Sequence, residues 1–199
     1  MIAIITLTVT EEQKQYAKHL IETTNFGKRG EFDGNKEQQF IGMLAQTAVA
    51  DYLGLPRPVP SDKPDGGVDF IVENLSVDVK CMKRHVEMKP HFSHNFYGGQ
   101  LHFNTDILLF TSFNVTNDIL TICGWITKRR FRKIANYYPQ GSKKYRDDGS
   151  YIVIRGNAGN YEITQNKLNN FKGKEQFFEE MKAIYKRKTG RGRKRGVAK

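Results

Sequence analysis

Between Lys36 and Leu53 apolar residues recur at helical spacing, and two short β-rich runs follow soon after. The apolar positions are 40, 41, 44, 45, 48, 49, 52 and 53, the stripe of an amphipathic helix, and Gly54 supplies its C-terminal stop. The β-rich runs Val68–Val72 and Val77–Cys81 are separated by Glu73–Ser76, a pattern that predicts a hairpin. We therefore expect the helix to pack against a sheet that contains this hairpin.

Other segments show weaker patterns of the same two kinds. Thr10 followed by Gln13 resembles a capping box and predicts a helix to about Thr23. Further strands are predicted at Ile107–Phe113, Ile119–Ile126, Tyr151–Ile154 and Tyr161–Ile163, and further helices at Thr127–Tyr138 and Phe171–Tyr185. Helices on both sides of a central run of strands indicate one α/β or α+β domain. We assign residues 1–185 to this domain, with its motif core at about 36–127.

The length and the residue types point to a folded protein of a reducing compartment. A chain of 199 residues with 38% hydrophobic residues is long enough for one domain with a real core. No apolar run is long enough to cross a bilayer, and the N-terminal segment lacks the basic region of a signal peptide. Cys81 and Cys123 are the only cysteines. These observations predict a cytoplasmic protein with no membrane partner.

Positive charge is concentrated at the C-terminus. The formal net charge is +11, and residues 186–199 contain no acid but eight basic residues: Lys186, Arg187, Lys188, Arg191, Arg193, Lys194, Arg195 and Lys199. A flexible basic arm is a good partner for nucleic-acid phosphates. A merely solubilising tail is the alternative reading of this segment.

The hairpin carries the residues best suited to catalysis. Because side chains alternate along a strand, Asp78 and Lys80 share one face, and pairing could bring Asp69 next to Asp78. Two such carboxylates would repel each other unless a cation lay between them, and oxygen ligands favour Mg²⁺ or Mn²⁺. Asp69 and Asp78 are thus the predicted metal ligands, and Lys80 is suited to orient the attacking water and neutralise charge in the transition state.

The sequence Asp65-Gly66-Gly67-Val68-Asp69, followed by Val77-Asp78-Val79-Lys80, resembles the PD-(D/E)XK nuclease superfamily, in particular Mrr-type and phage-type members. The helix at 40–54 is similar to the one that precedes this motif in such proteins. The resemblance implies a restriction-endonuclease-like core, in which helices flank a central mixed β-sheet. It also implies Mg²⁺ dependence and the hydrolysis of DNA phosphodiesters.

Gln46 departs from the family pattern, and either of two aspartates can be the first acid of the motif. Many members carry a Glu on the first core helix where this chain has Gln46, so Gln46 is a candidate catalytic residue that brings no charge. Asp65 is the alternative to Asp69 as the first acid. We prefer Asp69 because it begins a β-rich run, whereas Asp65 stands in a glycine turn.

The expected partner is DNA, with RNA not excluded and a homodimer left open. Predicted nucleic-acid contacts are Lys83, Arg84, Lys128, Arg129, Arg130 and Arg132, together with Lys186, Arg187, Lys188, Arg191, Arg193, Lys194 and Arg195 of the tail. One alternative function is a nucleic-acid-binding protein of the same fold without catalysis, which Gln46 keeps open. Another is an HNH-type nuclease that uses the histidines of His85–His102, a segment with little periodicity that we expect to be a mobile loop.

Overall fold

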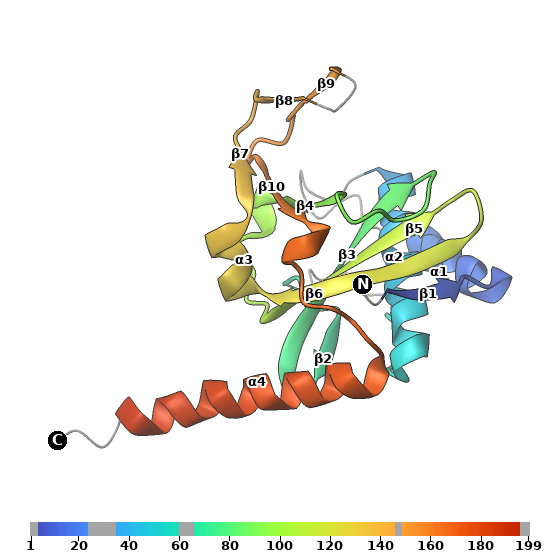
Figure 1. The fold of residues 1–199 in the computed structure, drawn as a ribbon. Coiled ribbons are helices and arrows are strands. Elements are labelled where there is room, and N and C mark those ends of the chain that lie inside the picture. The colour runs from blue at the N-terminus through green and yellow to red at the C-terminus, as the bar shows by residue number, and fades with distance from the viewer. Residues whose placement is uncertain (1–3, 24–34, 60–65, 146–148, 196–199) are drawn as a thin grey trace.

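A computed structural model of the chain describes residues 4–23, 35–59, 66–145 and 149–195, with side chains as far as residue 190. Its centre is a curled five-stranded sheet of order β1-β6-β5-β3-β2 (Figure 1). The strands are β1 (Ile5–Thr8), β2 (Phe70–Val72), β3 (Leu75–Arg84), β5 (Ile107–Asn114) and β6 (Ile119–Thr127). Because β3 and β5 are parallel and the other neighbours antiparallel, the sheet is mixed, and the fold is α+β as predicted.

In the described part of the chain the sheet is accompanied by the α-helices α1 (Glu11–Thr23), α2 (Lys36–Leu53), α3 (Lys128–Ile134) and α4 (Lys174–Arg195). The side chain of Asn35 and that of Gln38 form a capping box at the start of α2, and Gly54 ends the helix with a φ of 71°. The apolar stripe of α2 lies in one core cluster with Val77 and Val79 of β3. The predicted packing of this helix against the hairpin is therefore confirmed.

The hairpin itself follows from its turn. Glu73 and Asn74 have φ values of 49° and 63°, and two central residues with positive φ match the right-handed twist of the flanking strands. The turn sets the register in which Phe70 pairs with Val77. Antiparallel pairing of these two strands is as predicted, although β3 begins earlier than predicted, at Leu75.

The described residues also form two smaller sheets. One has the order β4-β10-β7, and the other pairs β8 with β9. Their strands are β4 (Ser93–Tyr97), β7 (Asn136–Tyr138), β8 (Lys143–Tyr145), β9 (Tyr151–Val153) and β10 (Asn160–Thr164), with short 3-10 helices η2 (Gly98–Gln100) and η3 (Gln165–Lys167). In Figure 1 the β8–β9 pair stands away from the central sheet.

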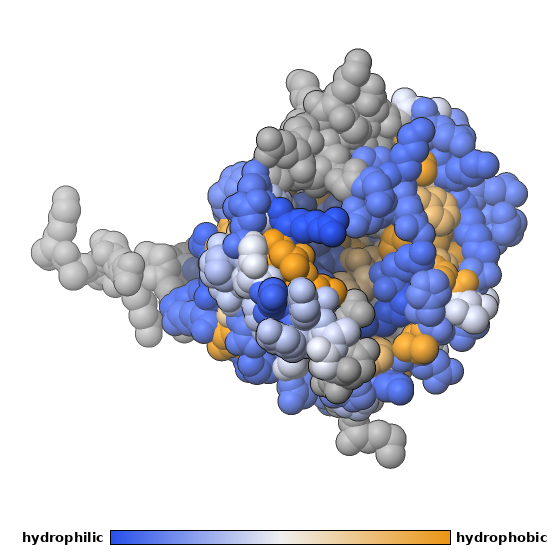
Figure 2. Space-filling view, turned by 90° about the horizontal axis from the view of Figure 1, so that it is seen from above, coloured by the Kyte–Doolittle hydropathy of each residue, from blue (hydrophilic) through white to orange (hydrophobic). Residues whose placement is uncertain are grey.

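The central sheet separates two cores. Val77, Val79 and Leu109 join the cluster that contains α2 and the first half of α4. Leu108 and Phe110 join a second cluster on the other side. Adjacent residues of one strand thus belong to different cores, as the alternation of side chains requires. On the face shown in Figure 2 the surface is largely hydrophilic, with hydrophobic side chains in small, separate patches.

Three predictions of local structure differ from the structure. The segment predicted to be a mobile loop contains β4, because β10 supplies its hydrogen-bonding partners from far along the chain. The predicted helix Thr127–Tyr138 ends at Ile134 and is followed by β7. Helix α4 runs past the predicted domain boundary at residue 185, so residues 186–195 continue a helix rather than forming a flexible arm. None of the described helices is long and apolar enough to cross a membrane.

Candidate catalytic site

Asp78 and Lys80 lie together on the face of β3 opposite α2. The Asp78 side chain is almost fully buried, and its Oδ1 is 2.6 Å from Lys80 Nζ. Lys80 Nζ also lies 5.6 Å from the centre of the Phe96 ring. A buried carboxylate is costly unless a charged or hydrogen-bonding partner compensates it. The sequence predicted this pair correctly, because burial of Val77 and Val79 against α2 directs Asp78 and Lys80 to the other side.

Asp69 stands just before β2 and contacts the residues on either side of Asp78. Its N–H donates to the carbonyl of Val77 at 2.9 Å. Its Oδ2 accepts from the N–H of Val79 at 2.6 Å. In a regular sheet a backbone carbonyl of the neighbouring strand would accept this bond. The regular pairing of β2 thus ends at Phe70, and the carboxylate of Asp69 lies along the edge of β3. The structure brings Asp69 to the same short stretch of β3 as Asp78.

Gln46 reaches this place from α2. Its side chain is largely buried, and its Nε2 donates to Asp69 Oδ1 at 2.8 Å. The position predicted to replace a family Glu therefore faces the first acid, as a candidate site residue should. The contact uses the amide nitrogen, so Gln46 holds one oxygen of Asp69 while its own amide oxygen takes no part in this bond.

Lys128, predicted from the sequence as a nucleic-acid contact, also lies near Asp78 and Lys80. The residue is 5% exposed, and its Nζ donates to the carbonyls of Gln100 at 3.2 Å and Phe103 at 2.5 Å. The Nζ is 5.7 Å from the Phe96 ring, which Lys80 also approaches. Burial lowers the pKa of Lys128 to about 8, while the negative charge of Asp78 acts in the opposite direction. A second ammonium thus lies on the Asp78 side of the sheet.

Gly67 explains why the segment before Asp69 is glycine-rich. Its φ is +77°, and a Cβ there would lie 2.5 Å from Cδ2 of Phe103. Thr105 Oγ1 donates to the Gly67 carbonyl at 2.7 Å. This turn is therefore held against residues 103–105, the same stretch that receives Lys128. Asp65, the alternative first acid, lies outside the described residues.

The predicted nucleic-acid contacts have different surroundings. Lys83 forms an ion pair with Glu37. Arg84 is partly buried, donates to the carbonyl of Ser93 at 2.7 Å, and has a pKa lowered by burial. The exposed predicted contacts are Arg129, Arg130, Arg132, Lys186, Arg187 and Lys188. The side chains of Arg191, Arg193, Lys194 and Arg195 fall outside the part that the structure describes.

The histidine segment does not form a cluster of reactive side chains. His94 is fully buried in β4, and its Nε2 is 2.7 Å from Gln165 Oε1. Burial lowers the pKa of His94 to about 4. The rings of His91 and His102 lie edge-on against Phe92 and Phe103. Within the described ranges, no three His, Cys, Asp or Glu side chains are grouped as a metal site.

Comparison of the chain with models of known families, with curated proteins and with solved structures found no match.

Proposed function

We propose that this protein is a metal-dependent nuclease of the PD-(D/E)XK type, which hydrolyses phosphodiester bonds of DNA. The observation that carries the proposal is the joint placement of Asp69, Asp78 and Lys80 on the hairpin. Asp78 is buried in contact with Lys80, and Asp69 bonds to both residues that flank Asp78. Buried charged groups are costly to a fold, and their concentration at one place is typical of functional sites.

The donor set fits a hard divalent cation. Asp69 and Asp78 would supply carboxylate oxygens, and the Gln46 amide holds one oxygen of Asp69. Oxygen donors of this kind suit Mg²⁺ or Mn²⁺ rather than a metal that prefers sulfur or imidazole. When bound, such a cation would lower the pKa of a water ligand and polarise a phosphodiester oxygen.

The protein's own side chains have distinct parts in this reaction. Water adds to phosphorus, one phosphorus–oxygen ester bond breaks, and the leaving oxygen takes up a proton. In this proposal Lys80 would hold the attacking water and neutralise the charge that develops on the phosphoryl oxygens. Lys128, fixed by two carbonyls, adds positive potential on the same side of the sheet.

Nucleic-acid binding without cleavage is the second candidate, and one observation favours it. Both acids have protein partners: Lys80 pairs with Asp78, and Gln46 with the N–H of Val79 satisfies Asp69. These bonds stabilise the carboxylates without a metal. Metal-dependent cleavage by the purified protein separates the two functions.

The test is cleavage of supercoiled and linear DNA with Mg²⁺ or Mn²⁺, with EDTA as the metal-free control. Asp78→Asn and Lys80→Met should each lower the rate at least about 100-fold, the scale seen when one transition-state contact is removed. Lys18→Met, an exposed lysine of α1, is the matched control and should cleave normally. Circular dichroism checks that every variant is folded. Full cleavage by either site variant contradicts the proposal, and absence of cleavage by the folded wild type favours the second candidate.

Gln46→Glu gives a readout that does not depend on activity. A carboxylate at this position would face Asp69 and repel it without metal, and a divalent cation would relieve the repulsion. Thermal unfolding should therefore show a larger stabilisation by Mn²⁺ in this variant than in the wild type. Equal shifts in both proteins would place Gln46 outside the metal site.

A further inference from the structure

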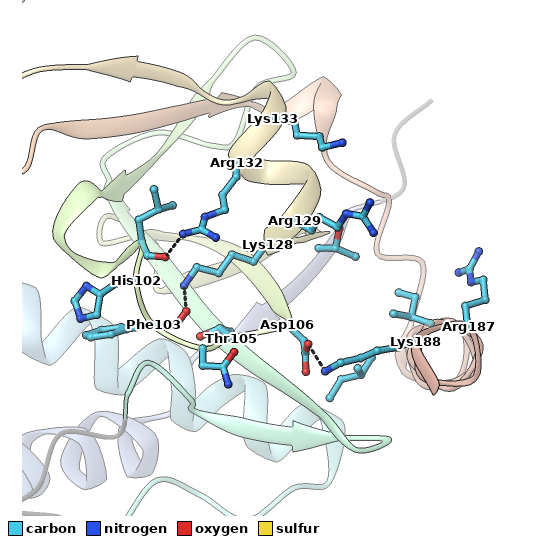
Figure 3. Close-up of a pocket in the computed structure, with 15 residues that line it drawn as sticks. His102, Phe103, Thr105, Asp106, Lys128, Arg129, Arg132, Lys133, Arg187 and Lys188 are labelled. Atoms are coloured by element: carbon cyan, nitrogen blue, oxygen red, sulfur yellow. Dashed lines mark hydrogen bonds and ion pairs between the residues drawn. The ribbon is translucent and has the colours of Figure 1, made fainter. Parts of the chain in front are cut away.

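A pocket of about 890 Å³ opens between α3, residues 101–106 and the C-terminal half of α4 (Figure 3). Helix α4 contributes Ile184, Arg187 and Lys188, whose spacing of three and four residues places them on one helical face. Helix α3 lies across the pocket from them. The cavity is thus built by segments that are far apart in the sequence.

Positive charge dominates the lining. Arg129, Arg132 and Lys133 of α3 join Arg187 and Lys188 of α4, with buried Lys128 beside them. Among the described residues that line the pocket, Asp106 is the only acid, and its Oδ1 accepts from Lys188 Nζ at 2.7 Å. A concave surface with this excess of cations concentrates the field on an anion inside it.

The pocket also has apolar walls. Leu75, Leu101, Phe103 and Ile184 take part in the lining. A phosphate alone gains nothing from such surfaces, and the stacked bases of a duplex do not enter a pocket. A nucleotide with an unpaired base presents both a phosphate and an apolar ring face, and it therefore matches the two kinds of lining.

The pocket is adjacent to the candidate catalytic site through a shared wall. Phe103 lines the pocket, and its carbonyl accepts from Lys128 Nζ. The Phe103 ring also approaches Gly67, two residues before Asp69. A strand held in the pocket would therefore have its neighbouring phosphates close to Asp78 and Lys80.

We propose that this pocket binds an unpaired stretch of a nucleic-acid strand, through phosphate contacts to the α3 and α4 cations and base contacts to its apolar wall. The link to cleavage rests on the proposed function, whereas the binding itself does not. The substrate would accordingly contain single-stranded nucleotides, such as a frayed end, a flap or a gap.

A phosphate of a bound strand would replace Asp106 as the partner of Lys188. The two side chains are 55% and 27% exposed, and exposed pairs stabilise a protein by only about 0–1 kcal/mol. A phosphate can therefore take over Lys188 at little cost. Asp106 keeps further partners, because its Oδ2 accepts from the N–H and the hydroxyl of Ser76.

The experiment is fluorescence anisotropy in EDTA with labelled oligonucleotides, so that no cleavage occurs. The probes are oligo(dT), oligo(rU) and a DNA duplex of equal length. The variants are Arg129→Gln/Arg132→Gln/Lys133→Gln and a control of equal charge, Lys167→Gln/Lys172→Gln/Lys182→Gln. The control lysines are exposed and do not line the pocket.

We expect the wild type to bind a single-stranded probe more tightly than the duplex. The pocket variant should lose at least about tenfold in affinity, and the control less than about threefold. The pocket variant should also show a shallower salt dependence, since each lost contact to a single strand changes the slope of log K against log[salt] by about 0.7.

Tighter binding of the duplex, or equal losses in the two triple variants, would overturn the pocket assignment. Comparing oligo(dT) with oligo(rU) tells whether a 2′-hydroxyl is preferred. These results are separate from those of the cleavage test. Asp78→Asn removes a negative charge and no cation of the pocket, so it should not weaken oligonucleotide binding, and a failure of catalysis and a failure of the pocket give different outcomes.

Discussion

The candidate site is built from polar side chains that the fold buries. Alternation along a strand was sufficient to place Asp78 beside Lys80, because that relation is local. The resemblance to the nuclease family, and not the apolar stripe, singled out Gln46, whose amide contacts Asp69. The approach of Lys128 to the same side could not be predicted, since it depends on where α3 begins relative to a strand about fifty residues earlier.

His94 shows how a chemically suggestive residue becomes structural. Its ring lies in the interior against Phe110 and pairs with Gln165, which in turn donates to the carbonyl of Cys123. Without the fold, a histidine in a segment rich in His and Asn resembles a catalytic group. Its position in β4 arises from pairing with β10, which lies far along the chain.

The burial of His94 predicts that the stability of the protein depends on pH. The pKa of His94 is about 4 in the folded protein and 6.5 as its ordinary value, so between these values the unfolded chain binds the extra proton. The free energy of unfolding should therefore fall as the pH drops from about 6.5 to about 4. The contribution is at most about 3 kcal/mol, from about 1.4 kcal/mol for each unit of difference.

Urea unfolding of the wild type and of His94→Asn at several pH values measures this contribution. Asparagine retains a side-chain N–H for Gln165 but does not titrate. The variant should be less stable at pH 7 yet lose less stability on acidification, while the carboxylates contribute similarly in both proteins. Parallel pH profiles would show that His94 does not titrate with a depressed pKa.

Strong local sequence signals were sufficient to predict a helix or strand, and weak signals were not. Helix α2 has a stripe, a cap at Asn35 and a stop at Gly54, and it forms where predicted. Strands β7 and β8 are three residues long and mostly exposed, so they carry little alternation. Their pairing depends on β10 and β9, which are distant contacts that no local window contains.

Alanine substitutions at two glycines should change the stability of the protein in opposite directions. Gly124 lies in β6 where the β5–β6 register shifts, has a φ of +142°, and a Cβ there would be 2.5 Å from the Asn169 carbonyl oxygen. Gly124→Ala should destabilise the protein by about 2–3 kcal/mol through strain and overlap. Gly42 is inside α2, and apart from its chain neighbours and the helix backbone no atom of the described residues lies within 4 Å of its Cβ position. Gly42→Ala should therefore stabilise the protein by about 0.5–1 kcal/mol.

Denaturant midpoints of the two alanine variants measure both effects on one scale. The pair is matched in chemistry, since each variant adds one methyl group. A neutral Gly124→Ala would mean that β6 can move away from residues 168–169. A destabilising Gly42→Ala would mean that the outer face of α2 is in contact with something that the described residues do not include.

The two halves of α4 have different surroundings in the molecule. Phe177 and Met181 are buried in the core cluster with α2, and Glu180 accepts from the indole N–H of Trp125. Farther along, the helix extends beyond the central sheet (Figure 1) and presents Arg187 and Lys188 to the pocket. The sequence predicted a change of character near residue 185, but the change is one of surface chemistry and not of secondary structure.

Deletion of residues 186–199 tests this division. The truncation leaves the core contacts of α4 in place and removes the exposed Lys188–Asp106 pair, so the free energy of unfolding should change by less than about 1 kcal/mol. It also removes eight positive charges. Binding of DNA should weaken, and its salt dependence should become shallower by well under the limit of about 0.9 per phosphate contact.

Cleavage at saturating protein should be nearly unchanged by this truncation, because Asp69, Asp78 and Lys80 lie on the hairpin, where Asp69 bonds to Val79 and Asp78 pairs with Lys80. Titrations of binding at several salt concentrations, with single-turnover cleavage measured alongside, report the two quantities separately. An unchanged salt slope would reduce the basic end of α4 to a solubilising segment. Loss of cleavage with binding retained would instead place a residue of 186–199 among the reacting groups, and the separation of affinity from chemistry would then be wrong.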